Sequence, residues 1–303
     1  MIKIFPNYPT YPYIGFTEKN VKIPLTFPKQ HQITQPGMEH LMSPSPLFDN
    51  PNYIPSNKLK DKVAIISGGD SGIGRATAVL FAKEGANIVI SYLNEHDDAN
   101  ITKQIIESYG RKCILIPGDL RDENVSNIIV KTTIDTFQKI DILINNCAVQ
   151  FPQNGILDIT ANQLKNTFET NIFSYFYLTK AILPYMEANS SIINTTSVTA
   201  FEGNETLIDY SATKGAILSF TKSLALSLSD QKIRVNAVAP GPIWTPLIVS
   251  SFDETKVESF GSNVPLKRAG QPFEVAPSYL FLASDDSLFV TGQVIHVNGG
   301  MII

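Results

Sequence analysis

The chain has 303 residues, of which 43% are hydrophobic and 17% are charged, and its formal net charge is −4. This composition is typical of a packed globular protein and excludes a disordered chain, a collagen and a small disulfide scaffold. The charge gives no electrostatic footprint for nucleic acid, and no apolar run approaches the roughly 20 residues that span a bilayer. We therefore expect neither nucleic acid nor a membrane as a partner.

Residues 1–57 are expected to form an extended arm, because ten of the 19 prolines fall in this stretch. Proline fixes φ and removes a backbone donor, which excludes a long helix or a central strand there. Tyrosine and phenylalanine are interleaved with these prolines, which indicates that the arm lies against an apolar surface. We expect residues 28–57 to lie ordered across the subunit surface, where the arm could cross onto a neighbouring subunit. The first 20 or so are expected to be mobile. The core is expected to retain every catalytic element without the arm.

From residue 58 onward, short apolar runs alternate with longer amphipathic stretches, which predicts one domain over 58–303. The expected strands are 63–67, 87–91, 113–116, 140–145, 191–195, 233–238 and 293–297. The expected helices lie near 73–84, 97–109, 122–138, 160–187, 206–229 and 272–284. Short β-branched runs separated by helices are typical of parallel strands that are buried on both faces. The pattern predicts an α/β fold, a Rossmann-type doubly wound parallel seven-stranded sheet with helices on both faces.

A glycine-rich turn with glycines at Gly68, Gly72 and Gly74 joins the first expected strand to the first expected helix. Gly68 permits the tight turn, Gly72 lets the backbone approach a pyrophosphate, and Gly74 allows the helix to pack closely on the strand. The helix N-terminus then offers free N–H groups and the positive end of its dipole to phosphates. Glycine turns between strand and helix are common, so the turn gains weight only from the strand before it and the helix after it.

Tyr210 and Lys214 are four residues apart in an expected helix and therefore share one of its faces. A free phenol has a pKa of about 10, which suits proton transfer near pH 7 poorly, and a neighbouring cation stabilises the phenolate. A tyrosine that acts as a general acid/base needs such a neighbour. Taken alone, the same spacing is also typical of a solvated helix face. Ser197 stands just after an apolar strand, where an open α/β sheet builds its site.

These motifs resemble those of the short-chain dehydrogenase/reductase family, and the resemblance covers residues 60–303. It is carried also by Asn145-Asn146-Cys147-Ala148, where the family usually has Asn-Asn-Ala-Gly, and by the segment from Pro240 to Thr245. Ala148 adds one methyl group where the cofactor passes close to backbone. Within the family, the chain looks like a bacterial branch described as glucose/ribitol-dehydrogenase-like.

The resemblance implies four catalytic residues. Ser197 would polarise the substrate oxygen, Tyr210 would exchange the proton, and Lys214 would also hold the nicotinamide ribose. Asn171 matches the helix asparagine that holds a proton-relay water, although a helix-surface or kink role is the plainer explanation of that residue alone. The implied cofactor-binding residues are Gly68, Asp70, Ser71, Gly72, Ile73, Gly74, Tyr92, Leu93, Asp119, Leu120, Asn145, Asn146, Ala148, Tyr210, Lys214, Pro240, Gly241, Ile243 and Thr245.

The choice between NAD and NADP is not decided by the sequence. An acid after the second strand would favour NAD and an arginine would favour NADP, but Tyr92 and Leu93 fill those positions. Glu95, Asp97 and Asp98 would repel a 2′-phosphate if they lie close to it, which gives a weak preference for NAD. An acidic helix start in solvent explains these three residues equally well.

The remaining features concern metals, location and assembly. The four histidines and two cysteines lack metal-ligand spacing, and the N-terminus lacks a signal-peptide pattern, so we expect no metal and a cytoplasmic location. The expected helices 160–187 and 206–229 are apolar nearly all round, so a second surface is expected to cover them. The resemblance implies that they pair between subunits, in a homotetramer or a dimer.

The sequence thus predicts an oxidoreductase that uses NAD or NADP to interconvert an alcohol and a carbonyl. The expected substrate is a small sugar, polyol or aldehyde-like molecule, with Tyr210 as the general acid/base. One alternative is a sugar-nucleotide epimerase or dehydratase, which shares the Tyr-x-x-x-Lys pattern but usually carries a sizeable C-terminal substrate domain. Another is a dinucleotide-sensing regulator on the same fold, a class that tends to lose the tyrosine or the lysine.

Overall fold

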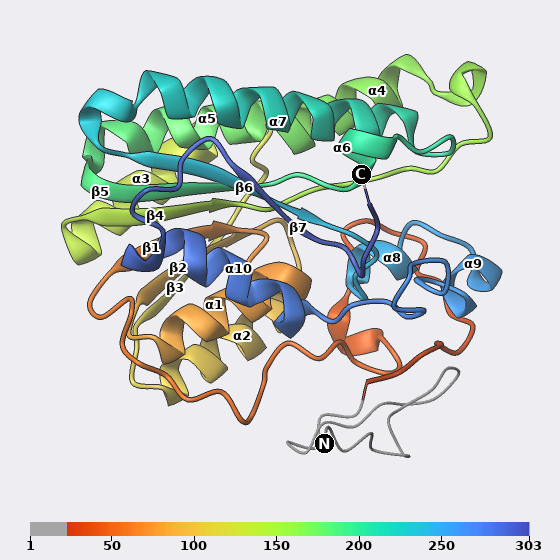
Figure 1. Ribbon diagram of the computed structural model, residues 1–303, viewed down its shortest axis with the longest axis horizontal. Helices are drawn as coiled ribbons and strands as arrows, with labels where there is room; N and C mark the ends of the chain where they lie inside the picture. Colours follow the sequence, from red (N-terminus) through yellow and green to blue (C-terminus); the bar gives the residue numbers. More distant parts are fainter. Residues whose placement is uncertain (1–22, 303) are drawn as a thin grey trace, which may run out of the picture.

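The computed structural model describes residues 23–302, in which a seven-stranded parallel sheet lies between two layers of helices (Figure 1). The strands are β1 Val63–Ser67, β2 Asn87–Tyr92, β3 Cys113–Pro117, β4 Ile140–Asn145, β5 Met186–Thr195, β6 Arg234–Pro240 and β7 Val294–Val297. Their order across the sheet is β3-β2-β1-β4-β5-β6-β7, with every neighbouring pair parallel. The predicted Rossmann-type fold is confirmed. Its strand order reverses between β1 and β4, the place where such sheets bind ligands.

Helices cover both faces of this sheet (Figure 1). One layer holds α1 Gly72–Lys83, α2 His96–Ser108 and α10 Pro272–Ala283, and the other holds α3 Glu123–Phe137, α4 Ala161–Phe168, α5 Ser174–Ile182 and α7 Ile208–Ser227. Three short helices, α6 Thr199–Glu202, α8 Pro246–Val249 and α9 Glu254–Glu258, follow strands β5 and β6. Each layer buries its own apolar cluster against the sheet, around Phe81 and Tyr279 on one face and around Leu178 on the other. No helix in residues 23–302 is both long and apolar enough to cross a membrane.

The helix expected over 160–187 is interrupted, which corrects the prediction. After α4 the chain makes one π-helical turn, Glu169–Phe173, and after α5 it ends in a 3-10 turn that contains Pro184. Proline lacks the N–H that would continue an α-helix. Strand β5 therefore begins earlier than expected, and its register shifts between the pairing of Met186 with Ile140 and that of Ser191 with Ile142. Asn189, inside this irregular stretch, adopts a left-handed φ of 72°.

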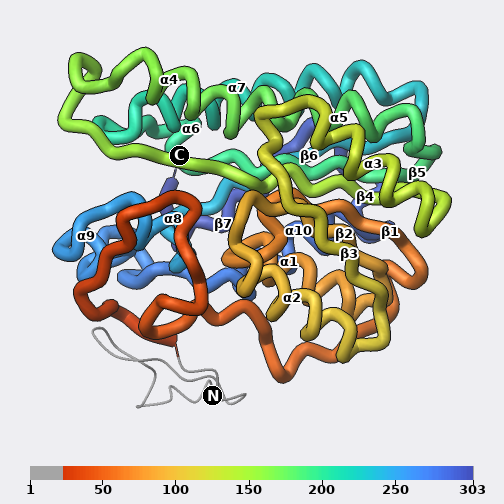
Figure 2. Tube along the Cα trace, turned by 180° about the vertical axis from the view of Figure 1, so that it is seen from behind, coloured from red at the N-terminus to blue at the C-terminus, as the bar shows by residue number. Residues whose placement is uncertain are grey.

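Residues 23–57 of the arm lie along the chain's own domain, beside α8 and α9 and then α1 (Figure 2). Phe27 stacks on Trp244 with ring centroids 3.7 Å apart, and both side chains are buried. The indole Nε1 of Trp244 donates to the carbonyl of Pro44 at 2.9 Å. Near the end of the arm, the hydroxyl of Tyr53 donates to Glu84. A contact with a neighbouring subunit stays a prediction, and the stretch expected to be mobile, the first 20 or so residues, lies outside the described range.

The outer faces of α5 and the preceding π-helical turn carry exposed aromatic side chains. Phe173 and Phe176 are 43% and 51% exposed, and Phe176 packs on Phe220 of α7 with ring centroids 4.3 Å apart. Leu226, further along α7, is 80% exposed. Exposed apolar side chains are what the predicted pairing of helices between subunits would cover. If the helices pair there, a charge placed on this face would be buried without a partner.

Phe176→Asp is therefore expected to shift the chain from a tetramer or dimer to a smaller species in light scattering at micromolar concentration. Ile101→Asp, on α2 in the other helix layer (Ile101 is 39% exposed), serves as the matched control and is expected to leave the mass unchanged. A monomeric mass for the unmodified chain would contradict the predicted assembly.

Candidate active site

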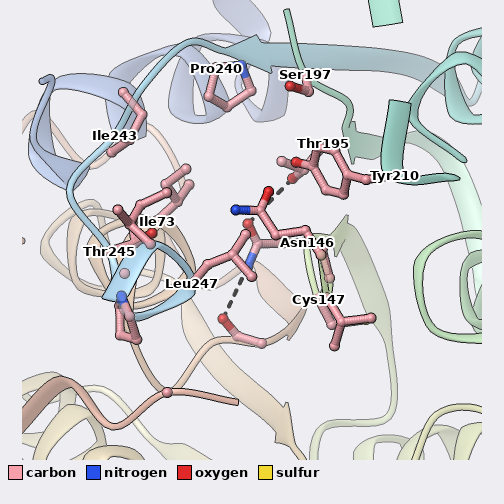
Figure 3. Close-up of a pocket in the computed structure, with 18 of the residues that line it drawn as sticks. Ile73, Asn146, Cys147, Thr195, Ser197, Tyr210, Pro240, Ile243, Thr245 and Leu247 are labelled. Carbon is pink, nitrogen blue, oxygen red and sulfur yellow. Dashed lines mark hydrogen bonds between the residues drawn. The ribbon is translucent and has the colours of Figure 1, made fainter. Parts of the chain in front are cut away.

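A cavity of about 800 Å³ opens at the carboxyl ends of the strands, where the turns after β1, β2, β4, β5 and β6 meet. This is the position expected of a ligand site in an open parallel sheet. In Figure 3, Tyr210 and Thr195 lie on one side of the cavity, and Ile73, Ile243 and Thr245 lie across from them.

The glycine turn after β1 has the geometry that the sequence predicted. Gly68 and Gly72 adopt left-handed φ angles of 63° and 52°, which favour glycine. A Cβ on Gly74 would lie 1.8 Å from the carbonyl oxygen of Gly68, so only glycine permits this approach of α1 to the turn. Helix α1 begins with Ser71 as its N-cap, so the N–H groups of its first turn point out of the helix end. The turn and the helix end together can hold a phosphate.

The proposed catalytic side chains come together at the end of β5. Tyr210 and Lys214 lie on one face of α7, and Ser197 follows β5. The ammonium of Lys214 lies 5.4 Å from the centroid of the Tyr210 ring and donates to the carbonyl of Thr195 at 2.9 Å. All three proposed catalytic residues line the cavity and are buried within its wall.

The protonation of this group differs from the expectation in one respect. Burial raises the pKa of the Tyr210 phenol to about 12, and the neighbouring Ser197 hydroxyl opposes this rise. Burial also lowers the pKa of the Lys214 ammonium to about 8. The expectation that the pKa of Tyr210 lies below that of a free phenol is wrong, because loss of hydration on burial raises it by more than the neighbouring groups lower it. At neutral pH the structure presents a protonated phenol beside a protonated amine.

Asn171 does not line the cavity. Its side chain is buried in the π-helical turn, where Oδ1 accepts the N–H of Val149 at 2.8 Å and Nδ2 donates to the Val149 carbonyl at 2.8 Å. Nδ2 also donates to the hydroxyl of Thr213 at 3.2 Å. The side chain thus holds Val149, which does line the cavity, and the predicted role with a relay water stays a prediction.

The two asparagines at the end of β4 face different ways. Asn145 is buried inside the sheet and donates to Asn194 at 2.9 Å, so it does not line the cavity. Asn146 does line it, and its Nδ2 donates to the carbonyl of Gly68 at 3.1 Å. Thr195 in turn donates to Oδ1 of Asn146 at 3.4 Å (Figure 3). Asn146 therefore ties the turn after β1 to the ends of β4 and β5.

Most of the predicted cofactor residues are brought to the cavity. Those that line it are Gly68, Asp70, Ser71, Gly72, Ile73, Tyr92, Leu93, Asp119, Leu120, Asn146, Ala148, Tyr210, Lys214, Pro240, Gly241, Ile243 and Thr245. The two that do not are Gly74 and Asn145, which pack the turn and the sheet behind it.

The end of the cavity beside β2 is acidic. Asp70 is 2% exposed, and its Oδ2 has no hydrogen-bond partner within residues 23–302. Burial and, to a smaller extent, the nearby Glu95 raise the pKa of Asp70 to about 8. The Glu95 carboxylate accepts the N–H groups of Leu93 and Asn94 at 3.1 and 2.8 Å. A ligand hydroxyl group suits this carboxyl group, because it can both donate a hydrogen bond to it and accept one from it.

The site fits a dinucleotide cofactor on three observations of the chain itself: the open first turn of α1, the close-packed glycine turn and the unpartnered Asp70 oxygen. Within residues 23–302, no group of three His, Cys, Asp or Glu side chains could hold a metal ion. Asp119, one of the implied cofactor-binding residues, forms an ion pair with Arg121 at 2.6 Å, and this contact lowers the pKa of the Asp119 carboxyl group.

Sequence reasoning missed part of the wall, because three arm residues line the cavity: Gln35, Pro36 and Gly37. The Nε2 of Gln35 donates to the carbonyl of Gln150 at 2.6 Å, and the N–H of Gln150 donates to Oε1 of Gln35 at 3.2 Å. A Cβ on Gly37 would lie 2.6 Å from the carbonyl oxygen of Pro246. In the arm sequence, the pair Pro36-Gly37 was the one sign of such a close approach, because glycine has no Cβ.

The other side of the cavity is formed by the loops after β4, β5 and β6. Gln150 is 4% exposed, and its Nε2 has no hydrogen-bond partner within the described residues, so it can donate to a ligand oxygen. Trp244, in the loop after β6, does not line the cavity and is fully buried against Phe27.

Comparison with known proteins agrees with this geometry. The sequence profile described as enoyl-(acyl carrier protein) reductase matches residues 68–302. The chain is 64% identical over 278 residues to the uncharacterized oxidoreductase YhxC of Bacillus subtilis, covering 92% of this chain and 97% of that protein. It is 53% identical to the chloroplastic NADPH-dependent aldehyde reductase 1 of Arabidopsis thaliana, over 91% of this chain and 98% of that one. It is 49% identical to the glucose and ribitol dehydrogenase of Daucus carota, over 91% and 97%.

Two solved structures share the fold. A short-chain dehydrogenase from Burkholderia cenocepacia in complex with NADP superimposes with a TM-score of 0.76 at 26% identity, covering 80% of this chain and 98% of that one. A 3-ketoacyl-(acyl-carrier-protein) reductase from Brucella melitensis, complexed with NADH, gives a TM-score of 0.72 at 29% identity, with the same coverage. The chain belongs to the short-chain dehydrogenase/reductase family, and within it to the glucose/ribitol-dehydrogenase-like type.

Proposed function

We propose that this oxidoreductase interconverts an alcohol and a carbonyl compound with NAD(H) or NADP(H), with Tyr210 as the general acid/base. The observation that carries the proposal is one cavity that joins the glycine turn to the cluster of Ser197, Tyr210 and Lys214. Neither alternative is favoured. The tyrosine and lysine that a sensor tends to lose are both present, and the matched relatives include a dehydrogenase and a reductase.

The roles follow from protonation and position. A bound nicotinamide supplies or accepts the hydride, and the chain's own residues handle the substrate oxygen. In reduction, the protonated phenol of Tyr210 donates its proton to that oxygen, while the Ser197 hydroxyl donates a hydrogen bond to it. The Lys214 ammonium stabilises the phenolate left behind, which matters because burial disfavours that anion. First-turn N–H groups of α1 would hold the pyrophosphate, and Lys214 the nicotinamide ribose.

The substrate that fits best is small and carries oxygen besides the reacting group, such as a sugar, polyol or hydroxyaldehyde. The unpartnered Nε2 of Gln150 supports this, because a buried donor is stabilised by an acceptor. Asn204 and Thr199 add polar groups to the wall, and Leu207 and Leu247 limit its size. A cytoplasmic location and a tetramer or dimer complete the proposal.

NAD(H) is proposed as the better cofactor, with measurable use of NADP(H). Support comes from Glu95, which lines the cavity beside β2, where its carboxylate would face a 2′-phosphate. The two nearby arginines are already paired: Arg75 is buried between Glu39 and Asp98, and Arg121, which lines the cavity after β3, forms an ion pair with Asp119.

Replacing the catalytic phenol tests the mechanism. Tyr210→Phe is expected to lower kcat by about 10²–10⁴-fold, the range of general acid catalysis, while the Kd for NADH changes little. The rate is followed at 340 nm with a panel of aldehydes and sugars, and the Kd by fluorescence titration. Tyr177→Phe is the matched control in a neighbouring helix. A Tyr210→Phe enzyme with near-normal kcat would remove Tyr210 from the mechanism.

The pH profile tests Lys214. Its ammonium is charged below a pKa of about 8 and loses the proton above it, whereas Tyr210 stays protonated up to about pH 12. We expect kcat/KM for carbonyl reduction to be level below pH 8 and to fall about tenfold per pH unit above it. Lys214→Ala is expected to lower activity and NADH affinity at every pH and to lack this step. A wild-type profile that stays level to pH 10 would contradict the assignment.

Cofactor preference tests the acidic wall. The kcat/KM with NADH is expected to exceed that with NADPH by about 10–100-fold, or about 1.4–2.8 kcal/mol. Glu95→Gln is expected to lower the ratio of kcat/KM with NADH to kcat/KM with NADPH, because it removes one negative charge near the 2′ position of the adenosine ribose. A preference for NADPH, or discrimination beyond about 10⁴-fold, would show that another residue sets the choice.

A further inference from the structure

The arm reaches the glycine turn through one buried carboxylate, Glu39. This residue opens the 3-10 turn Glu39–Leu41 and is 2% exposed. Its Oε2 accepts the N–H of Gly72 at 2.6 Å, and its Oε1 forms an ion pair with the Arg75 guanidinium. Burial raises the pKa of Glu39, and the charge of Arg75 and the Gly72 N–H act in the opposite direction.

The backbone at Glu39 is fixed by Asp98 of α2. Oδ2 of Asp98 accepts the N–H of Glu39 at 2.6 Å, and Oδ1 accepts the N–H of His40 at 3.0 Å. Arg75 joins the same group, since its Nη2 donates to the Asp98 carbonyl at 3.0 Å. Three separate segments, the arm, α1 and α2, therefore meet at one set of buried charges, and Glu39 has little freedom to move.

This group holds the glycine turn at two points. Glu39 takes the N–H of Gly72, and Arg75 donates through Nε to the carbonyl of Asp70 at 2.9 Å. Asp70 and Gly72 stand on either side of Ser71, the N-cap of α1. The peptide that carries the Ile73 N–H follows directly after Gly72, which has a φ of 52°. Because glycine has no Cβ, its backbone can take many conformations unless a contact fixes it.

Glu39 contacts the first residue of α1, at the helix end proposed to hold the phosphates. Helix N-termini bind phosphate through N–H groups that already point at it, and binding is weakened when those groups must first be ordered. Gly72 donates its N–H outward to Glu39, so the next N–H groups of the first turn remain for the ligand.

We propose that Glu39 is a positioning residue for the dinucleotide site: by holding the Gly72 peptide and Arg75, it fixes the first turn of α1 for the cofactor pyrophosphate. This inference rests on the proposed function, because it assumes a dinucleotide in the cavity. It makes the arm part of the cofactor site, where the sequence had suggested a covering segment.

The test measures binding without turnover. Binding of ADP-ribose, which carries the pyrophosphate but no nicotinamide, is followed by calorimetry, together with binding of NADH and the melting temperature without ligand. Glu39→Ala is expected to weaken ADP-ribose binding at least tenfold, or about 1.4 kcal/mol. Glu39→Gln keeps an acceptor for the Gly72 N–H but loses the charge opposite Arg75, and is expected to bind with intermediate affinity.

Tyr53→Phe is the matched control, because Tyr53 belongs to the same arm and its hydroxyl donates to Glu84 at the other end of α1. It is expected to lower the melting temperature and leave the Kd for ADP-ribose unchanged. Affinity within twofold of wild type for Glu39→Ala would overturn the proposal. So would tighter binding, which would mean that the carboxylate competes with the pyrophosphate. A wild-type chain that binds neither ADP-ribose nor NADH would instead overturn the proposed function.

Discussion

The site depends on the close approach of α1 to the turn after β1. The absence of a side chain on Gly74 lets the helix start directly above the Gly68 carbonyl, and Asn146 donates to that same carbonyl from the end of β4. One backbone oxygen thus fixes the distance between the N-terminus of α1 and the end of β4. The side chain of Asn146 also accepts a hydrogen bond from the Thr195 hydroxyl, and the Thr195 carbonyl accepts one from the Lys214 ammonium. The glycine turn and the catalytic cluster are therefore joined by a short chain of hydrogen bonds, and neither can move far without the other.

Burial shifts the pKa values of Tyr210 and Lys214, at the other end of these hydrogen bonds. Loss of hydration disfavours every charge, so it raises the pKa of Tyr210 and lowers that of Lys214, which brings the two closer together. A phenol that is protonated at neutral pH is suited to donate to an oxygen that gains negative charge. The Lys214 ammonium is held by a hydrogen bond that it donates to the Thr195 carbonyl.

Much of this could be predicted from sequence, and the failures have physical causes. Buried parallel strands and glycine turns have strong local signals, so the seven strands and the residues after them were placed within a few positions. The break at Glu169–Phe173 has no such signal, because a π-helical turn keeps the apolar pattern of the helix around it. Asn145 and Asn146 are identical in type, and only the alternation of a strand decides that one faces the sheet and the other the cavity. The pKa of Tyr210 depends on burial, which spacing alone does not reveal.

The arm shows the limit of local reasoning most clearly. Its prolines predict an extended chain, but an extended chain has few internal hydrogen bonds and must find partners on the surface that it covers. Those partners are backbone groups that loops leave unpaired: the carbonyl and N–H of Gln150, and the N–H of Gly72. Such groups are concentrated around the ligand site, because loops and helix ends form it. The polar groups of the arm therefore find their partners beside the cavity. Glu39 is buried there because the first turn of α1 offers a donor to its carboxylate and Arg75 offers an opposite charge.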